Sequence, residues 1–235
     1  MKLMKLIKIA ALGLLVCLSN FSLNAQSKKQ SYSFKKGEIL DILLLTTKPE
    51  GGALFDRYKK TAFPVASKRS YKPQPGFIIK ESTQSSFHPQ NFLFGKWDNL
   101  ESREKFLAEI ETEVPDFHKQ RRDIWSIFNM TYYEMTKDIS FEIDRNKYNV
   151  VTSYWKKDAN AFNTFKKEWI QKSKNKGGKN ILALTKGISP LGYYYNPDYM
   201  VITQWENKAA FDAFYKENLK MNHKGVKDVN QFVIN

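Results

Sequence analysis

The feature that most constrains the fold is a stretch of sequence that occurs twice. Residues 87–99 read FHPQNFLFGKWDN, and residues 195–207 read YNPDYMVITQWEN, at an offset of 108 residues. Upstream, residues 55–68 align with residues 162–175 at an offset of 107. Two blocks in the same order and at nearly the same offset predict that one unit of about a hundred residues was duplicated.

Each copy predicts the same order of elements: strand, helix, strand, strand, helix, strand. The first copy is expected over residues 37–135 and the second over residues 147–235, with a connector at 136–146. In the third strand of each copy, Phe92–Trp97 and Met200–Trp205, apolar side chains occupy both faces. Since helices cover only one face, the other face is expected to pack on the partner sheet. The predicted fold is α+β: two ferredoxin-like βαββαβ units packed sheet to sheet as a single-chain α/β barrel.

A strand that ends in Trp, an acidic residue and Asn, followed by a helix, occurs at Trp97–Asn99 and again at Trp205–Asn207. This pattern, in tandem, resembles the dimeric α/β-barrel superfamily, which includes antibiotic-biosynthesis-monooxygenase-like proteins and haem-degrading monooxygenases. The resemblance covers most of residues 37–235. It implies the fold and leaves the reaction open, because members range from cofactor-free oxygenases to proteins with no known reaction. The repeated asparagines are expected to cap helices, and the repeated tryptophans to anchor the core.

The first 25 residues have the organisation of a secretory signal peptide. Three lysines within the first eight residues precede an apolar run at residues 9–18, which is too short to cross a bilayer. The small residue Ala25 stands directly before Gln26. We therefore expect cleavage after Ala25, export to the periplasm or the extracellular space, and a flexible lead over residues 26–36.

Cys17 lies within this leader and is the only cysteine of the chain. A lipoprotein modified at Cys17 is the alternative, although Val16 stands where a small residue is wanted. The cleaved chain would have no thiol for disulfides, catalysis or metal binding, and no apolar stretch long enough for a transmembrane segment. Loss of the three leader lysines lowers the formal net charge from +14 to +11. This excess favours an anionic envelope surface as a partner, and export argues against nucleic acid.

Two histidines, His118 and His223, each lie on or just after the second predicted helix of their copy. Haem-degrading members of the superfamily resemble this arrangement, with a second Trp and an Asn completing their site. Here Phe106 and Phe214 stand at the position of the second Trp, and the two histidines do not align at the repeat offset. We therefore expect exposed or capping histidines rather than haem degradation. Three scattered histidines give no metal signature, and no cofactor is expected.

Tyrosines are the best candidates for lining a binding site. A cavity with aromatic walls and hydroxyl groups suits a flat apolar ligand, although β-propensity and packing explain the same residues. Because the second copy is richer in tyrosines and glycines around residues 187–199, we expect any pocket in the second half. The candidate ligand-binding residues are Tyr154, Tyr194 and His223, followed by Tyr132 and His118.

Two hypotheses for the function follow. The chain is either an exported protein that binds a small apolar or aromatic ligand or an envelope component, or a cofactor-independent monooxygenase or isomerase acting on such a ligand. A side chain that abstracts a proton must reach the substrate, so a His, Asp or Glu inside a closed cavity would favour the enzyme. The sequence has no P-loop, dinucleotide-binding fingerprint or nucleophile elbow.

The signal peptide is testable by intact-mass measurement of the exported protein. We expect an N-terminus at Gln26, because the apolar run ends a few residues before Ala25. A mature chain that begins with a lipidated Cys17 would contradict the expectation.

Overall fold

The computed structural model describes residues 28–85, 87–190 and 192–235. The expected signal peptide at residues 1–25, including Cys17, lies outside the described residues. Within the described part of the chain, no helix combines the length and the apolar character that a membrane span requires.

Two ferredoxin-like units make up the fold, as the sequence predicted. The first contains β2 (Ile39–Thr47), α1 (Gly51–Lys68), β3 (Lys72–Gln84), β4 (Asn91–Trp97), α2 (Leu100–Glu113), α3 (Phe117–Ile124) and β5 (Trp125–Glu134). The second contains β7 (Tyr148–Lys156), α4 (Ala159–Asn175), β8 (Lys179–Thr185), β9 (Tyr199–Trp205), α5 (Lys208–Asn218) and β10 (Val226–Ile234). The strand orders β5-β2-β4-β3 and β10-β7-β9-β8 are equivalent, and both follow the split βαβ pattern.

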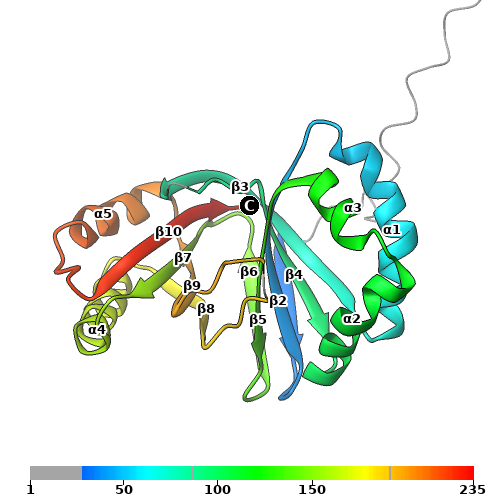
Figure 1. Cartoon of the computed structure of the whole chain (residues 1–235). Coiled ribbons are helices and arrows are strands. Elements are labelled where there is room, and N and C mark those ends of the chain that lie inside the picture. The colour runs from blue at the N-terminus through cyan, green and yellow to red at the C-terminus, as the bar shows by residue number, and fades with distance from the viewer. Residues whose placement is uncertain (1–27, 86, 191) are drawn as a thin grey trace, which may run out of the picture.

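The two units join edge to edge on both sides. On one side β3 pairs antiparallel with β10, which makes one continuous eight-stranded sheet. On the other side β5 meets the segment that follows β8, where Tyr132 and Ile188 exchange two backbone hydrogen bonds of 2.9 Å. Figure 1 shows α4 and α5 on the outside of one half, and α1, α2 and α3 on the outside of the other. The sheets therefore face each other as a barrel, with the helices outside.

Apolar side chains fill the inside of this barrel. Phe92 and Phe94 from β4 lie in one buried cluster with Met200 and Ile202 from β9 and with Phe232 from β10. The residues of opposite parity on the same strands face the helices instead, in two separate clusters, one for each unit. The expectation that each sheet is covered by helices on one face and by the partner sheet on the other is confirmed.

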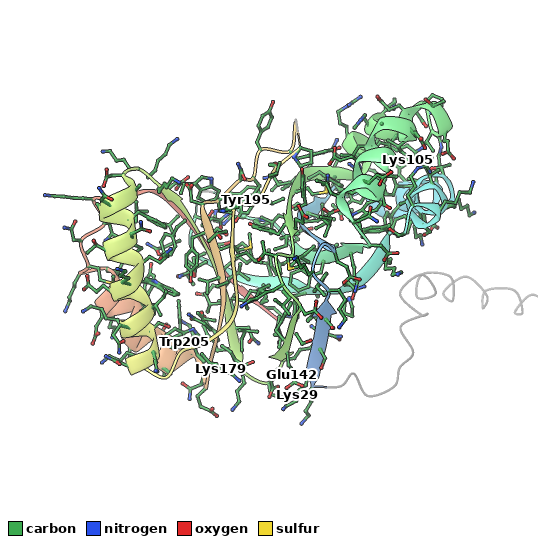
Figure 2. All side chains as sticks on the ribbon, turned by 90° about the horizontal axis from the view of Figure 1, so that it is seen from below. Lys29, Lys105, Glu142, Lys179, Tyr195 and Trp205 are labelled. Carbon is green, nitrogen blue, oxygen red and sulfur yellow. The ribbon has the colours of Figure 1, made fainter. Side chains whose placement is uncertain are left out.

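The expected flexible lead at residues 26–36 is wrong for its described part. Lys29–Phe34 forms strand β1, which pairs antiparallel with β6 (Ile139–Asp144) from the connector. Tyr32 and Phe34 are buried in the barrel cluster, while Ser31 and Ser33, which alternate with them, are exposed. This alternation is typical of a half-buried strand, but it is short and lies among lysines. At the open end of the strand pair, Lys29 forms an ion pair of 3.0 Å with Glu142 (Figure 2).

Two further differences concern the first unit. Strand β3 begins at Lys72, because Pro73 and Gln74 already pair with β4, although a segment with two prolines is typical of a loop. Helix α3 was not predicted at all, since only Phe117 and Ile124 of its eight residues are apolar. It follows Pro115 and has no counterpart among the described residues of the second unit.

The β1–β6 pair is expected to contribute to the stability of the barrel. Phe34→Ala should lower the free energy of unfolding by about 3–5 kcal/mol, because it empties a fully buried site. Ser31→Ala, on the exposed face of the same strand, is the control and should change it by less than about 0.5 kcal/mol. Urea unfolding of both variants measures the difference. Equal midpoints would show that β1 does not pack as described.

Candidate functional site

A cavity of about 1160 Å³ lies between the helices and the sheet of the first unit, and it extends along β3 toward Asn235. Its size is slightly above the ~300–1,000 Å³ typical of small-molecule sites. Most of the wall is aromatic or aliphatic. The aromatic residues on the helix side of the sheet are Phe55, Tyr58, Phe63, Tyr71, Trp97, Phe106, Trp125 and Phe128.

At the equivalent place in the described part of the second unit, larger side chains occupy the space. The repeat offset of 107 places Trp169 at the position of Ala62, and the strand registers place Tyr154 at the position of Leu45. Ala62 and Leu45 line the cavity. Trp169 and Tyr154 instead belong to the packed core of the second unit, where their rings pack edge to face with centres 6.1 Å apart. Small residues in one half and large ones in the other therefore decide which unit has a cavity.

A buried ion pair forms part of the cavity wall. The Arg103 side chain is 1% exposed and donates from Nε to Oδ1 of Asp41 at 2.8 Å. The other carboxylate oxygen of Asp41 accepts from the indole Nε1 of Trp97 at 2.7 Å. The Arg103 guanidinium lies 3.8 Å from the ring centre of Tyr132, and its Nη1 reaches Glu104 at 3.0 Å. Asp41 has the only acidic side chain among the described residues that line the cavity.

This ion pair has an apolar counterpart in the second unit. Val150 stands at the position of Asp41 in the strand register, and Phe211 at the position of Arg103 in the repeat. Both are fully buried, so the same fold is stable without the charges. Since desolvation of two charges offsets much of their attraction, the pair in the first unit is not explained by stability alone.

The second buried arginine, Arg121 on α3, has no carboxylate partner among the described residues. It is 8% exposed and lines the cavity. Its Nε donates to the hydroxyl of Tyr58 at 3.0 Å and its Nη1 to the hydroxyl of Tyr193 at 2.5 Å. The guanidinium carbon lies 4.1 Å from the ring centre of Phe117 and 4.4 Å from that of Phe128. Aromatic rings and two phenols hold this cation, and none of them neutralises its charge.

His118 is connected to this arginine through a tyrosine. The hydroxyl of Tyr193 lies 3.3 Å from Nδ1 of His118, next to the Arg121 contact. Burial, followed by the nearby Arg121 charge, lowers the pKa of His118 below its usual value. Burial raises the pKa of Tyr58, although Arg121 opposes the shift. At neutral pH the imidazole of His118 is therefore neutral and can accept a hydrogen bond from the Tyr193 hydroxyl, while Arg121 remains the charged group.

The structure does not bring the predicted pocket residues of the second half together around a cavity. Tyr154 is part of the packed core between sheet and helices, and Tyr194 is 80% exposed. His223 packs against Phe165 with ring centres 5.0 Å apart. None of the three lines the cavity of the first unit, and a pocket lined by them stays a prediction.

The two candidates from the first half do lie near the cavity, and each contacts one of its arginines. Tyr132 stacks against Arg103, and His118 reaches Arg121 through Tyr193. Neither residue lines the cavity itself. Over the ranges that the structure describes, no group of three His, Cys, Asp or Glu side chains is placed to hold a metal ion.

The structural anchors occupy the predicted positions. Asn99 and Asn207 cap α2 and α5 by accepting from the backbone of Ser102 at 2.8 Å and of Ala210 at 3.0 Å. Trp97 and Trp205 are buried between the sheets and the helices. Figure 2 shows Trp205 near α4, whereas Tyr195 lies toward the middle of the molecule.

Sequence reasoning missed three residues of the site: Asp41, Arg103 and Arg121. A signal existed for Arg103, because Phe211 replaces it in the second copy while the scaffold residues match. A second signal was the pair Ala62 and Trp169, which are equivalent in the repeat. Their difference in side-chain volume indicates that the first unit is packed less densely than the second. No comparable signal marks Arg121, since α3 has no counterpart in the second copy.

Comparison with known proteins agrees with the fold. The chain is similar to a solved anthrone oxidase-like protein, with a TM-score of 0.50 and 15% identity over 87% of this chain and 94% of that one. It is also similar to a variant of chlorite dismutase from Candidatus Nitrospira defluvii, with a TM-score of 0.50 and 9% identity over 86% and 93%. No family model matches the sequence, and no curated protein matches it. The chain therefore has the dimeric α/β-barrel fold in tandem, and at these identities the likeness does not extend to a reaction.

The buried ion pair generates a stability prediction. Asp41→Asn or Arg103→Met alone should lower the free energy of unfolding by about 3–5 kcal/mol, because each leaves a buried charge without its partner. The double variant Asp41→Val with Arg103→Phe carries the residues of the second unit and should lose less than either single variant. Glu104→Ala, which removes only the exposed partner of Arg103, is the control. Chemical denaturation of the four variants tests this, and a double variant less stable than both singles would contradict it.

Proposed function

We propose that this chain binds a flat, apolar small molecule in the cavity of the first unit, between the helices and the sheet. The observation that carries the proposal is the difference between the halves: Ala62 and Leu45 leave space where Trp169 and Tyr154 fill it. The apolar wall of this space lacks the packing contacts that Trp169 and Tyr154 make in the other half. A bound ligand that prefers the folded state offsets their absence. In line with the expected signal peptide, we propose that binding takes place outside the cytoplasm.

The wall of the cavity suits an aromatic ligand in particular. Rings from α1, β4 and β5 line one continuous space, and the polar groups among them are few and have defined positions. Apolar walls with a few convergent polar groups are typical of small-molecule sites. The hydroxyl of Tyr58 and the ion pair of Arg103 with Asp41 are the groups that would orient the ligand.

A second candidate function, a cofactor-independent oxygenase or isomerase, is favoured by one observation. Asp41 lines the cavity, so a carboxylate is available where a base would have to be. Both of its oxygens already accept hydrogen bonds, from Trp97 and Arg103. Neither oxygen is therefore free to take a proton from a ligand, and for that reason we place binding first. Dioxygen consumption by the protein with bound ligand, lost in Asp41→Asn, would reverse this order.

Filling the cavity tests the binding proposal. Ala62→Trp introduces the residue of the second unit and should reduce the affinity for the fluorescent alcohol 1-pyrenebutanol at least tenfold, because the indole occupies the ligand's space. Ala53→Trp, an exposed position on the same helix, is the matched control and should bind like the wild type. Fluorescence titration measures both. Absence of binding by the wild-type protein, or equal binding by Ala62→Trp, would contradict the proposal.

A further inference from the structure

We propose that the ligand of this cavity carries a single carboxylate, and that Arg121 is its anchor. The inference rests on the proposed binding function and adds the chemical class of the ligand. It starts from a buried cation that no acidic side chain of the described residues neutralises.

The charges of the cavity wall do not cancel. Arg103 is neutralised by Asp41 at 2.8 Å, which leaves no second carboxylate for Arg121. Lys80 and Arg145 add positive charge toward the β3 end of the cavity. Burying a cation without a counter-ion is costly, so an anion in the cavity removes an existing penalty. Among the described lining residues, Arg121, Lys80 and Arg145 carry positive charge that the Asp41 carboxylate, already paired with Arg103, does not balance, so the wall favours an anion.

The geometry of Arg121 leaves part of its guanidinium available. Its Nε and Nη1 donate to the hydroxyls of Tyr58 and Tyr193, and no described residue accepts from its Nη2. The rings of Phe117 and Phe128, with centres 4.1 and 4.4 Å from the guanidinium carbon, restrict its orientation. A fixed guanidinium with a free N–H group is prepared to bind a carboxylate oxygen, because little side-chain entropy remains to be lost.

Tyr58 adds a second donor to the same place. Its oxygen accepts from Arg121, and it lines the cavity. The phenol keeps its proton, because burial outweighs the effect of the arginine. No described residue accepts that proton, so it remains available to the ligand. The combination of Arg121 Nη2 and the Tyr58 hydroxyl therefore selects a carboxylate over a neutral hydroxyl or ester group.

A pair of probes with the same ring system separates this inference from the binding proposal. 1-Pyrenebutyrate carries a carboxylate, and 1-pyrenebutanol carries an alcohol at the same position. The full-length exported protein should bind the acid about 10- to 100-fold more tightly than the alcohol, as expected for a hydrogen bond to a charged group. Arg121→Met should remove this difference by weakening the binding of the acid much more than that of the alcohol.

Three further variants complete the test. Arg122→Met removes the same charge from the exposed neighbour on α3 and should leave the preference for the acid intact. Arg121→Lys should retain part of the preference, because it keeps the charge. Arg121→Gln keeps polar contact with the two tyrosines and serves in place of Arg121→Met if that variant does not fold.

The outcomes distinguish the two proposals. A wild-type protein that binds both probes equally overturns the carboxylate anchor and leaves the binding function standing. Equal weakening of both probes in Arg121→Met assigns the arginine to the shape of the cavity and also overturns the anchor. A wild-type protein that binds neither probe overturns both proposals.

Discussion

Each of the two sheets is apolar on both faces, and this constraint determines how the halves meet. Helices cover the outer faces, so the inner faces are removed from water only by packing on each other. Phe92 and Phe94 of the first sheet and Phe232 of the second lie in one cluster as a result. The β1–β6 pair adds Tyr32 and Phe34 to that cluster. The inside of the barrel is thus occupied by the protein's own side chains.

Because the barrel is filled, space for a ligand depends on how well the helices pack on the outer faces. The second unit achieves dense packing with Trp169 and Tyr154, whereas the first leaves Ala62 and Leu45 at the same places. The first unit also contains the charged residues Asp41 and Arg103, where the second is apolar. A fold with one well-packed half tolerates an under-packed half, since stability is a property of the whole cooperative unit. The two halves share a topology, and they differ in how densely the side chains pack between the helices and the sheet.

The fold was predictable because it follows from period-two alternation and from a junction that occurs twice. The alternation of Phe92 and Phe94 against Leu93 and Trp97 required two covering layers, and the structure has them. Strand β1 escaped prediction because its alternation covers only Tyr32 and Phe34 and depends on pairing with a distant segment. Strand pairing over more than a hundred residues is decided by tertiary context, which local pattern does not contain.

The site was less predictable, because a cavity is a relation between side chains and not a property of one residue. Tyrosine is a residue type that often lines pockets, yet Tyr154 belongs to the packed core, because Trp169 and Phe165 pack edge to face against its ring. Whether a side chain lines a cavity or packs in a core depends on its neighbours, and the first unit has Leu45 and the small Ala62 at the positions of Tyr154 and Trp169. A comparison of the two units indicates this difference in packing. Ala62 and Leu45 are smaller than their equivalents Trp169 and Tyr154.

Closure of the barrel and the candidate anchor are physically connected. The segment after β8 closes the barrel through the backbone hydrogen bonds between Ile188 and Tyr132. The same segment carries Tyr193, whose ring packs on Phe128 and whose hydroxyl holds Arg121. The arginine belongs to the first unit, and one of its two phenol partners belongs to the second. A ligand that binds Arg121 in this arrangement favours the state in which the two units are joined, so part of its binding free energy stabilises the closed barrel.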